Sequence, residues 1–438
     1  MRQVFLEKGN IVVKDLAEPI LEENSVLVST YYSFISSGTE LATVSNAQEN
    51  TVLNKKSLLL SRVIRKSKKV LESLAQNGFE GTKELIKARL KGEAHGTLLP
   101  LGYSCSGKVV AVGKNVSKIK IGDFVACAGA GFASHADLVC VPENLVAVVK
   151  REFVKEASAT TIGAIGMQGL RRANVQLGET VCVLGLGLLG QITAQLAKAA
   201  GCNVIGVDLL QERLDLAKES GVDFVYNPEK DDVKKEIEFL TQHAGADCTI
   251  ITAASKSDAI VQQAMEATRK KGKVVVVGDV GLSLQRSPFY KKEIDFLISC
   301  SYGPGRYDPK YELEGKDYPY AYVRWTENRN MQAFIKLIET KKIDIGKLIS
   351  KTIFVDEASE AYQSIQGAHS LGAVLSYVPK RDDAYIEKYK EQNNKSEDKE
   401  FKFDFDALIN EQKKEIRVGF VGAGGFAKMK LMPIVSKI

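Results

Sequence analysis

The stretch TVCVLGLGLLGQITAQLAKAAG, residues 180–201, decides the fold of this chain. It begins with an apolar run typical of a buried strand, turns at a cluster of glycines, and continues as a segment whose apolar residues recur at helical spacing. The run NVIGVD, residues 203–208, follows at once and ends in an acid. This order predicts a strand, a tight turn, a helix and a second strand parallel to the first.

The glycines of this turn, Gly185, Gly187 and Gly190, have the spacing G-x-G-x-x-G. The first permits the tight turn, the second lets a pyrophosphate approach the backbone, and the third lets the helix pack closely on the strand. Phosphates then bind the free N–H groups at the helix N-terminus. Asp208 accepts hydrogen bonds from ribose hydroxyls and repels a 2′-phosphate, which favours NAD(H) over NADP(H). The predicted cofactor-binding residues are Gly185, Gly187, Leu188, Leu189, Gly190, Asp208, Ala253 and Gly278.

The composition excludes several classes of protein. Of the 438 residues, 45% are hydrophobic and 26% are charged, as in ordinary soluble enzymes, and a net charge of +6 is too small to indicate a nucleic-acid partner. No apolar run reaches the roughly 18 residues of a membrane span, and the N-terminus lacks a secretory pattern. The seven cysteines form no CxxC pair, which indicates reduced thiols. We therefore expect a cytoplasmic protein without membrane or nucleic-acid partners.

Hydrophobic periodicity divides the chain into parts. Short strand-like runs occupy residues 1–45 and 102–150, which favours a small barrel, whereas from about residue 151 strands alternate with helices, which predicts a parallel sheet covered on both faces. Residues 46–95 are predicted to be a helical insertion with one basic face, for which a solvated face or a subunit contact is favoured over polyanion binding. The expected fold class is α/β, with parts at 1–150, 151–300, 301–380 (a return to the barrel), 381–414 (a charged linker) and 415–438 (an incomplete second dinucleotide fold).

Several motifs resemble one known family. They are SFISSGTEL (33–41), LGYSCSG (101–107), TIGAIGMQGL (161–170) and SYGPGRYDP (301–309). Over about residues 1–380 they resemble the medium-chain dehydrogenase/reductase superfamily, and more narrowly the zinc-less, alcohol dehydrogenase-like module of bacterial bi-domain oxidoreductases. IRVGFVGAGGFAK (416–428) looks like the start of the Gfo/Idh/MocA-type Rossmann module of those proteins. The resemblance implies a GroES-like catalytic barrel beside a Rossmann domain.

The chain departs from the zinc-dependent members of this superfamily. The resemblance places their metal-ligand positions at Ser37, at Tyr103 and at Thr160 or Thr161. Zinc requires thiolate, imidazole or carboxylate ligands, which hydroxyls do not replace. The four histidines lack ligand spacing, and the family's four-cysteine lobe is missing. We therefore expect no bound metal, and a packing role for Cys105.

Without a metal, a side chain must polarise the reacting oxygen. Tyr103 is the first candidate for the proton donor, because the reference pKa of tyrosine, about 10, suits a general acid. Residues of the Ser-Gly-Thr-Glu turn (37–40) are expected to shape the same pocket. The loop SYGPGRYD (301–308) follows a predicted strand end, where such sheets bind ligands. The predicted catalytic residues are Tyr103, Ser37, Thr39, Glu40, Tyr302, Arg306 and Tyr307.

These residues predict a zinc-independent, NAD-dependent oxidoreductase acting on a hydroxyl or keto group of a small molecule. A sugar-like substrate and a role in cell-surface polysaccharide biosynthesis are implied only by the resemblance, and we further expect a homo-oligomer. Two alternatives stay open: an enone or tetrapyrrole-side-chain reductase, which would prefer NADPH, and a non-catalytic NAD-binding redox sensor or scaffold. A single strand and helix make no independent core, so Gly422, Gly424 and Ala427 are expected to bind no second cofactor.

Overall fold

The computed structural model describes residues 1–7, 9–38, 40–41, 98–255, 257–365, 370–377 and 385–389. Thr39, the predicted helical insertion and the predicted start of a second dinucleotide fold lie outside the described residues. Of the predicted linker, only residues 385–389 are described.

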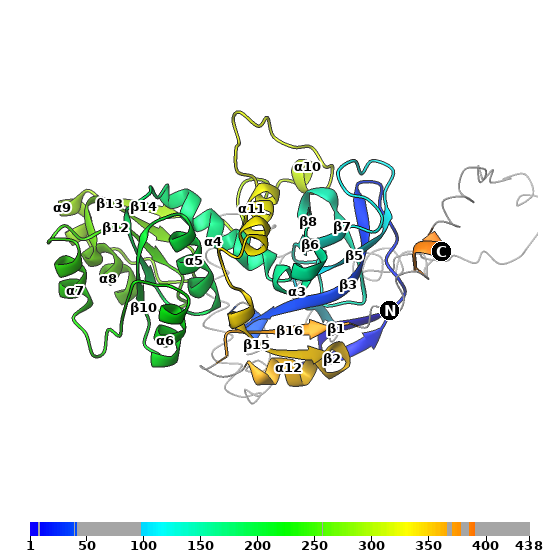
Figure 1. Ribbon diagram of the computed structural model, residues 1–438, viewed down its shortest axis with the longest axis horizontal. Coiled ribbons are helices and arrows are strands. Elements are labelled where there is room, and N and C mark those ends of the chain that lie inside the picture. Colours follow the sequence, from blue (N-terminus) through cyan, green and yellow to red (C-terminus); the bar gives the residue numbers. More distant parts are fainter. Residues whose placement is uncertain are drawn as a thin grey trace, which may run out of the picture. The chain divides into compact units, whose positions relative to one another are not determined.

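Six parallel strands form the sheet that the alternation of strands and helices predicts (Figure 1). In the spatial order β11-β10-β9-β12-β13-β14, the strands are Phe224–Tyr226, Asn203–Val207, Thr180–Leu184, Ala246–Ile251, Thr268–Val276 and Asp295–Ile298. The helices between them are α5 (Leu188–Ala199), α6 (Gln211–Glu219), α7 (Val233–Leu240), α8 (Ala259–Ala267) and α9 (Arg286–Lys292). The strand order runs outward from β9 on one side and from β12 on the other. The carboxyl ends of these two strands therefore form the switch point at which such sheets bind ligands.

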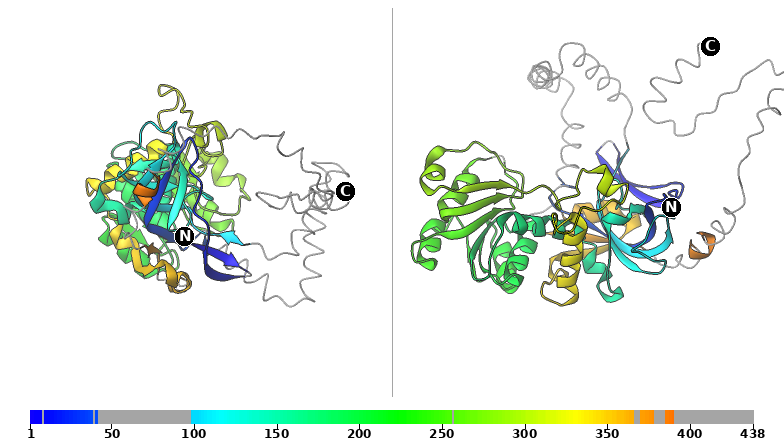
Figure 2. Two further views of the ribbon diagram at one scale, coloured as in Figure 1. Left: turned by 90° about the vertical axis from the view of Figure 1, so that its right-hand side faces the viewer. Right: turned by 90° about the horizontal axis from the view of Figure 1, so that it is seen from above.

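Side chains of the central strand β9 alternate between two cores. Val181 and Val183 pack with residues of α5 and α6, whereas Cys182 and Leu184 pack with residues of α7 and α8. Figure 1 shows α5 and α6 on one side of the sheet and α7, α8 and α9 on the other, and Figure 2 gives two further views of this arrangement. Because both faces are covered, the strands are continuous apolar runs in the sequence.

A mostly antiparallel sheet forms the barrel. Its order is β15-β16-β3-β5-β6-β8, with β7 paired to β3, and the strands are Ile349–Phe354, Gly372–Ser376, Ser25–Ser36, Ser104–Val112, Phe124–Ala128, Val146–Val148 and Leu138–Pro142. A second sheet, β2-β1-β4, consists of Asn10–Asp15, Arg2–Glu7 and Leu99–Pro100. Strand β16 pairs with β3, so the chain rejoins the barrel after it leaves the parallel sheet. The fold is thus the expected α/β combination of barrel and Rossmann sheet.

The other described helices are α3 (Val154–Ala157), α4 (Thr160–Ala173), α10 (Pro309–Glu312), α11 (Glu327–Glu339) and α12 (Ala358–Ser364). Short 3₁₀ turns are η1 (Glu143–Leu145), η2 (Arg151–Phe153), η3 (Gly346–Leu348) and η4 (Val355–Glu357). None of the helices in the described part of the chain is long and apolar enough to cross a membrane.

Helix α4 makes close contacts with two other helices through glycines. A Cβ atom on Gly163 would stand 2.3 Å from the ring of Phe334 in α11. A Cβ on Gly166 would stand 3.1 Å from the Thr193 hydroxyl oxygen in α5. Phe334 is fully buried. Because these two glycines have no side chain, α4 can approach both helices closely.

We predict that Gly163→Ala lowers the free energy of unfolding by about 1–3 kcal/mol, because the added methyl group overpacks the contact with Phe334. Chemical denaturation monitored by circular dichroism measures the change. Gly38→Ala is the matched control, because a Cβ there meets no atom within 4 Å. Equal stability of the two variants would show that Phe334 adapts at no cost.

Candidate functional site

The glycine turn after β9 is built by close backbone approaches. Gly185 has a φ of +92°, and a Cβ there would stand 2.6 Å from Cβ of Ala253. A Cβ on Gly190 would stand 1.8 Å from the carbonyl oxygen of Gly185. A Cβ on Gly278 would stand 2.1 Å from the Ala253 carbonyl oxygen. The structure therefore brings together Gly185, Ala253 and Gly278, which follow the carboxyl ends of β9, β12 and β13.

The second glycine of the turn faces open space. The nearest atom to a Cβ on Gly187 would be Nη1 of Arg213, at 4.0 Å. Gly187 is the N-cap of α5, and no side chain of the described residues caps this helix end. The first N–H groups of the helix, on Leu188 and Leu189, are therefore free to bind an anion.

We call the glycine turn, residues 185–190, together with Asp208 the glycine cradle. Asp208 forms its side next to β10. Its carboxylate accepts the backbone N–H of Leu186 at 2.7 Å and that of Leu210 at 3.0 Å. Nη1 of Arg213 lies 3.5 Å from the Asp208 carboxylate. Arg213 was not predicted from the sequence, although its place in the helix that follows the acid was a usable signal. Asp208 thus holds the backbone of the glycine turn and pairs with the Arg213 guanidinium at the edge of the turn.

Tyr103 lies among hydroxyl groups. Its phenol oxygen is 2.7 Å from the hydroxyl oxygen of Ser36, and its backbone carbonyl accepts the Thr161 hydroxyl at 2.9 Å. The neighbouring Ser37 hydroxyl donates to the Leu371 carbonyl at 2.7 Å. The Thr160 hydroxyl is buried without a partner among the described residues. The structure therefore gathers Tyr103 and the three predicted hydroxyl residues into one region.

Glu40 is 4% exposed and lies in the barrel core rather than on an open pocket wall. One carboxylate oxygen is 3.0 Å from Nε2 of His135 and also accepts the Tyr362 hydroxyl. Burial, and then the Glu40 carboxylate, raise the pKa of Tyr362 well above its usual value. Neither His135 nor Tyr362 was singled out from the sequence, because both are distant from Glu40 along the chain.

The loop after β14 forms a separate polar cluster. The Arg306 guanidinium pairs with Glu312 at 2.7 Å, and its carbon lies 5.3 Å and 4.1 Å from the ring centroids of Tyr302 and Tyr307. Tyr302 is buried and its pKa is raised by that burial, whereas Tyr307 is 69% exposed. Asp308 caps α10 and accepts the Tyr318 hydroxyl at 2.6 Å, a structural role.

Glu327, at the start of α11, adds an unexpected group to this cluster. It is fully buried, and neither carboxylate oxygen has a hydrogen-bond partner among the described residues. Burial, and then the nearby Glu312, raise its pKa to about 9, so the group is neutral at pH 7. The Tyr302 hydroxyl and Nε of Arg306 also lack partners in the described part of the chain. Buried polar atoms ordinarily have hydrogen-bond partners, so these unpaired atoms can still bind the polar groups of a ligand.

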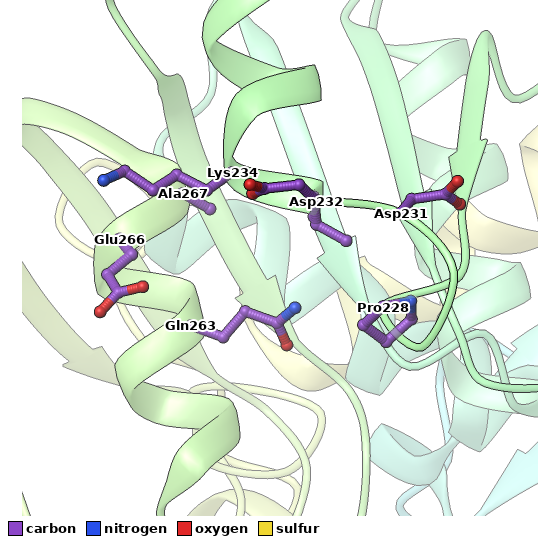
Figure 3. A pocket seen from close by; sticks show the side chains of 8 residues that line it. Pro228, Asp231, Asp232, Lys234, Gln263, Glu266 and Ala267 are labelled. Atoms are coloured by element: carbon purple, nitrogen blue, oxygen red, sulfur yellow. The ribbon is translucent and has the colours of Figure 1, made fainter.

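A hollow of about 300 Å³ lies away from these residues (Figure 3). It is lined by Pro228, Asp231, Asp232, Val233, Lys234, Gln263, Glu266 and Ala267. Acids predominate among its charged groups, and none of its residues belongs to the glycine cradle. A phosphate-bearing cofactor therefore fits the cradle better than this hollow.

Cys105 packs in the barrel core, fully buried, and faces Cys127 across the paired strands β5 and β6. The hydrogen bond between the two thiols, and then burial, raise the pKa of Cys127 well above its usual value. A reactive thiol needs the opposite surroundings. The structure therefore agrees with a packing role for Cys105.

Comparisons with known proteins agree with this geometry. The family model "Zinc-binding dehydrogenase" matches residues 189–313. D-guloside 3-dehydrogenase of Escherichia coli is 32% identical over 278 residues, which cover 61% of this chain and 74% of the relative. A NAD-dependent alcohol dehydrogenase of Sulfurisphaera tokodaii is 27% identical over 311 residues, covering 63% and 82%. The structure of galactitol-1-phosphate dehydrogenase from Escherichia coli superimposes with a TM-score of 0.63 at 17% identity, covering 86% of this chain and all of the other. The chain therefore belongs to the zinc-binding, medium-chain alcohol dehydrogenase family and is an oxidoreductase.

Proposed function

We propose that this chain interconverts a hydroxyl and a keto group on a sugar or sugar-derived substrate, with NAD(H) and without zinc. The observation that carries the proposal is the pairing of two features: an open glycine cradle closed by Asp208, and a phenol, Tyr103, among hydroxyl groups. The first suits a nicotinamide dinucleotide. The second offers a proton to the oxygen of a carbonyl group.

The cradle fits NAD(H) by three contacts of this chain's own groups. The free N–H groups of Leu188 and Leu189 would bind the pyrophosphate, because Gly187 leaves the approach open. Asp208 would accept a ribose hydroxyl with the lone pairs that its two backbone donors leave free. When bound, the nicotinamide supplies or accepts a hydride.

Tyr103 would handle the proton that accompanies this hydride. In the direction of reduction, its hydroxyl donates a proton to the substrate oxygen as the carbon receives the hydride. In the direction of oxidation, the phenolate takes that proton back. The Ser36 hydroxyl, 2.7 Å away, fixes the phenol during either transfer.

The family description implies zinc, but the residues of this chain do not fit it. The Ser37 hydroxyl is committed to the Leu371 carbonyl, the Tyr103 phenol to Ser36, and the Thr161 hydroxyl to the Tyr103 carbonyl. Within the described ranges no three His, Cys, Asp or Glu side chains converge on one point that could hold a metal. Neutral hydroxyls are poor zinc ligands. We therefore assign no step to a metal.

The sugar class of the substrate rests on the guloside-oxidising relative and on the motifs shared with bi-domain oxidoreductases. In this proposal Arg306 and the exposed Tyr307 contact the substrate's hydroxyl or anionic groups. The seven cysteines are free thiols, which supports a reducing, cytoplasmic location. A homo-oligomeric state, a role in cell-surface polysaccharide synthesis and a second Gfo/Idh/MocA-type module stay predictions of the sequence.

Turnover tests the proposed function. We expect oxidation of methyl D-guloside or another glycoside in a panel of glycosides, polyols and simple alcohols, with NAD⁺ preferred over NADP⁺. Activity should survive chelation, and elemental analysis should give well under one zinc per chain. Stoichiometric zinc would overturn the metal-free proposal. Absence of turnover despite NADH binding would favour a sensor or scaffold, and a preference for NADPH would favour an enone reductase.

Asp208→Ala tests the cofactor cradle. We expect at least tenfold weaker NADH binding and a gain in NADPH binding, because the loss of the carboxylate removes repulsion of a 2′-phosphate and frees Arg213 to bind it. Fluorescence titration of the two cofactors measures both effects. Asp215→Ala, an exposed acid in the following helix α6, is the control and should change neither affinity.

Tyr103→Phe tests the proton donor. We expect kcat to fall by about 10²- to 10⁴-fold while NADH affinity changes less than about threefold, because the ring stays and only the hydroxyl is lost. Steady-state kinetics on the substrate found in the panel measures the loss. Unchanged turnover would transfer the role to Tyr302 or Tyr307.

A further inference from the structure

A chain of hydrogen bonds runs from Tyr103, which is partly buried, into the buried interior of the barrel. The Ser36 hydroxyl meets the Tyr103 phenol at 2.7 Å, and the Ser36 backbone N–H donates to one carboxylate oxygen of Glu40 at 3.4 Å. The other carboxylate oxygen meets Nε2 of His135 at 3.0 Å and the Tyr362 hydroxyl. Beyond His135, its Nδ1 lies 2.7 Å from the hydroxyl oxygen of Ser33. The chain thus leads away from the phenol that the proposed function uses.

His135 is held rigidly at the centre of this chain. His135 is fully buried. Its backbone N–H donates to the Leu101 carbonyl, and its backbone carbonyl accepts the Val4 N–H. A Cβ on Gly102 would stand 2.5 Å from the His135 backbone nitrogen and 2.7 Å from its Cγ. Gly102 directly precedes Tyr103. The turn that presents the phenol is therefore shaped around the imidazole.

Among the groups joined by these hydrogen bonds, one arrangement of the protons gives every donor an acceptor. The Tyr377 hydroxyl, 2.8 Å from Ser33, donates to the serine oxygen, and Ser33 donates to Nδ1 of His135. The imidazole then carries its proton on Nε2 and donates it to Glu40. Reversal would leave the Tyr377 hydroxyl proton without an acceptor among these groups. Glu40 thus receives three donors, from Ser36, Tyr362 and His135.

We propose that Glu40 and His135 are positioning residues for Tyr103. Glu40 fixes the backbone of Ser36, the Ser36 hydroxyl fixes the phenol, and His135 with Tyr362 fixes Glu40. The inference rests on the proposed function, because it supposes that Tyr103 transfers the proton. Neither Glu40 nor His135 touches the substrate in this scheme. Their effect is to keep the phenol oxygen in one place, since a misplaced acid loses much of its rate effect.

A double-mutant cycle separates positioning from mere stability. Glu40→Gln should lower kcat about 10- to 100-fold, with the KM for NADH changed less than about twofold. In the Tyr103→Phe background the same substitution should cost less than about threefold, because the group that it positions is gone. His135→Gln should follow the same pattern. Glu360→Gln, on the exposed face of the helix that carries Tyr362, is the control and should leave kcat unchanged.

If Glu40→Gln fails to fold, Ser36→Ala carries the same cycle, since it removes the hydroxyl that holds the phenol and leaves all three donors of Glu40, the backbone N–H of residue 36 included, in place. Equal losses of kcat in both backgrounds would overturn the positioning role. Loss in neither background would also overturn it, whereas an inactive wild type would overturn the proposed function itself. Nitrogen-15 spectra of the imidazole test the network apart from turnover. We expect the His135 proton on Nε2, and a proton on Nδ1 would refute the arrangement.

Discussion

A Cβ atom on Gly190 would overlap the carbonyl oxygen of Gly185, and this single close approach determines the cofactor half of the molecule. It lets the first turn of α5 settle directly on the end of β9, so that the free N–H groups of the helix face the switch point of the sheet. Asp208 then holds the turn from the next strand through the backbone of Leu186. Helix α5, the glycine turn and Asp208 therefore pack as one unit. Their arrangement leaves the space next to Gly187 open.

In the proposed function, the barrel half has a different task, which is to orient the Tyr103 phenol without a metal. A metal ion draws its ligands into a fixed geometry by strong bonds, whereas a tyrosine is oriented only by packing and hydrogen bonds. In the proposal, Ser36 and the Glu40 carboxylate orient the phenol through hydrogen bonds, and Gly102, which precedes Tyr103, makes room for the imidazole of His135.

The sequence predicted what depends on neighbours along the chain. The glycine spacing, the acid that ends β10 and the alternation of strands with helices are local patterns, and the parallel sheet agrees with them. The hydroxyl residues around Tyr103 were found through family motifs. The Glu40–His135 contact was missed because 95 residues separate its partners, and a lone histidine in a strand-rich segment has no periodicity to reveal it. Glu327 was missed for a related reason: a glutamate at a helix start is ordinarily a surface residue, and only tertiary packing buries it.

The pairing of β16 with β3 has a consequence for the order in which the protein is made. All strands of the parallel sheet have left the ribosome once residue 298 has emerged, and their partners are close in sequence. The barrel sheet, in contrast, starts with β3 at Ser25 and is completed only with residues 372–376. Contacts between such distant segments form slowly, because a long loop must close first. During synthesis residues 32–36 of β3 therefore stay without their partner strand until β16 is made, while the middle of the chain folds ahead of both ends.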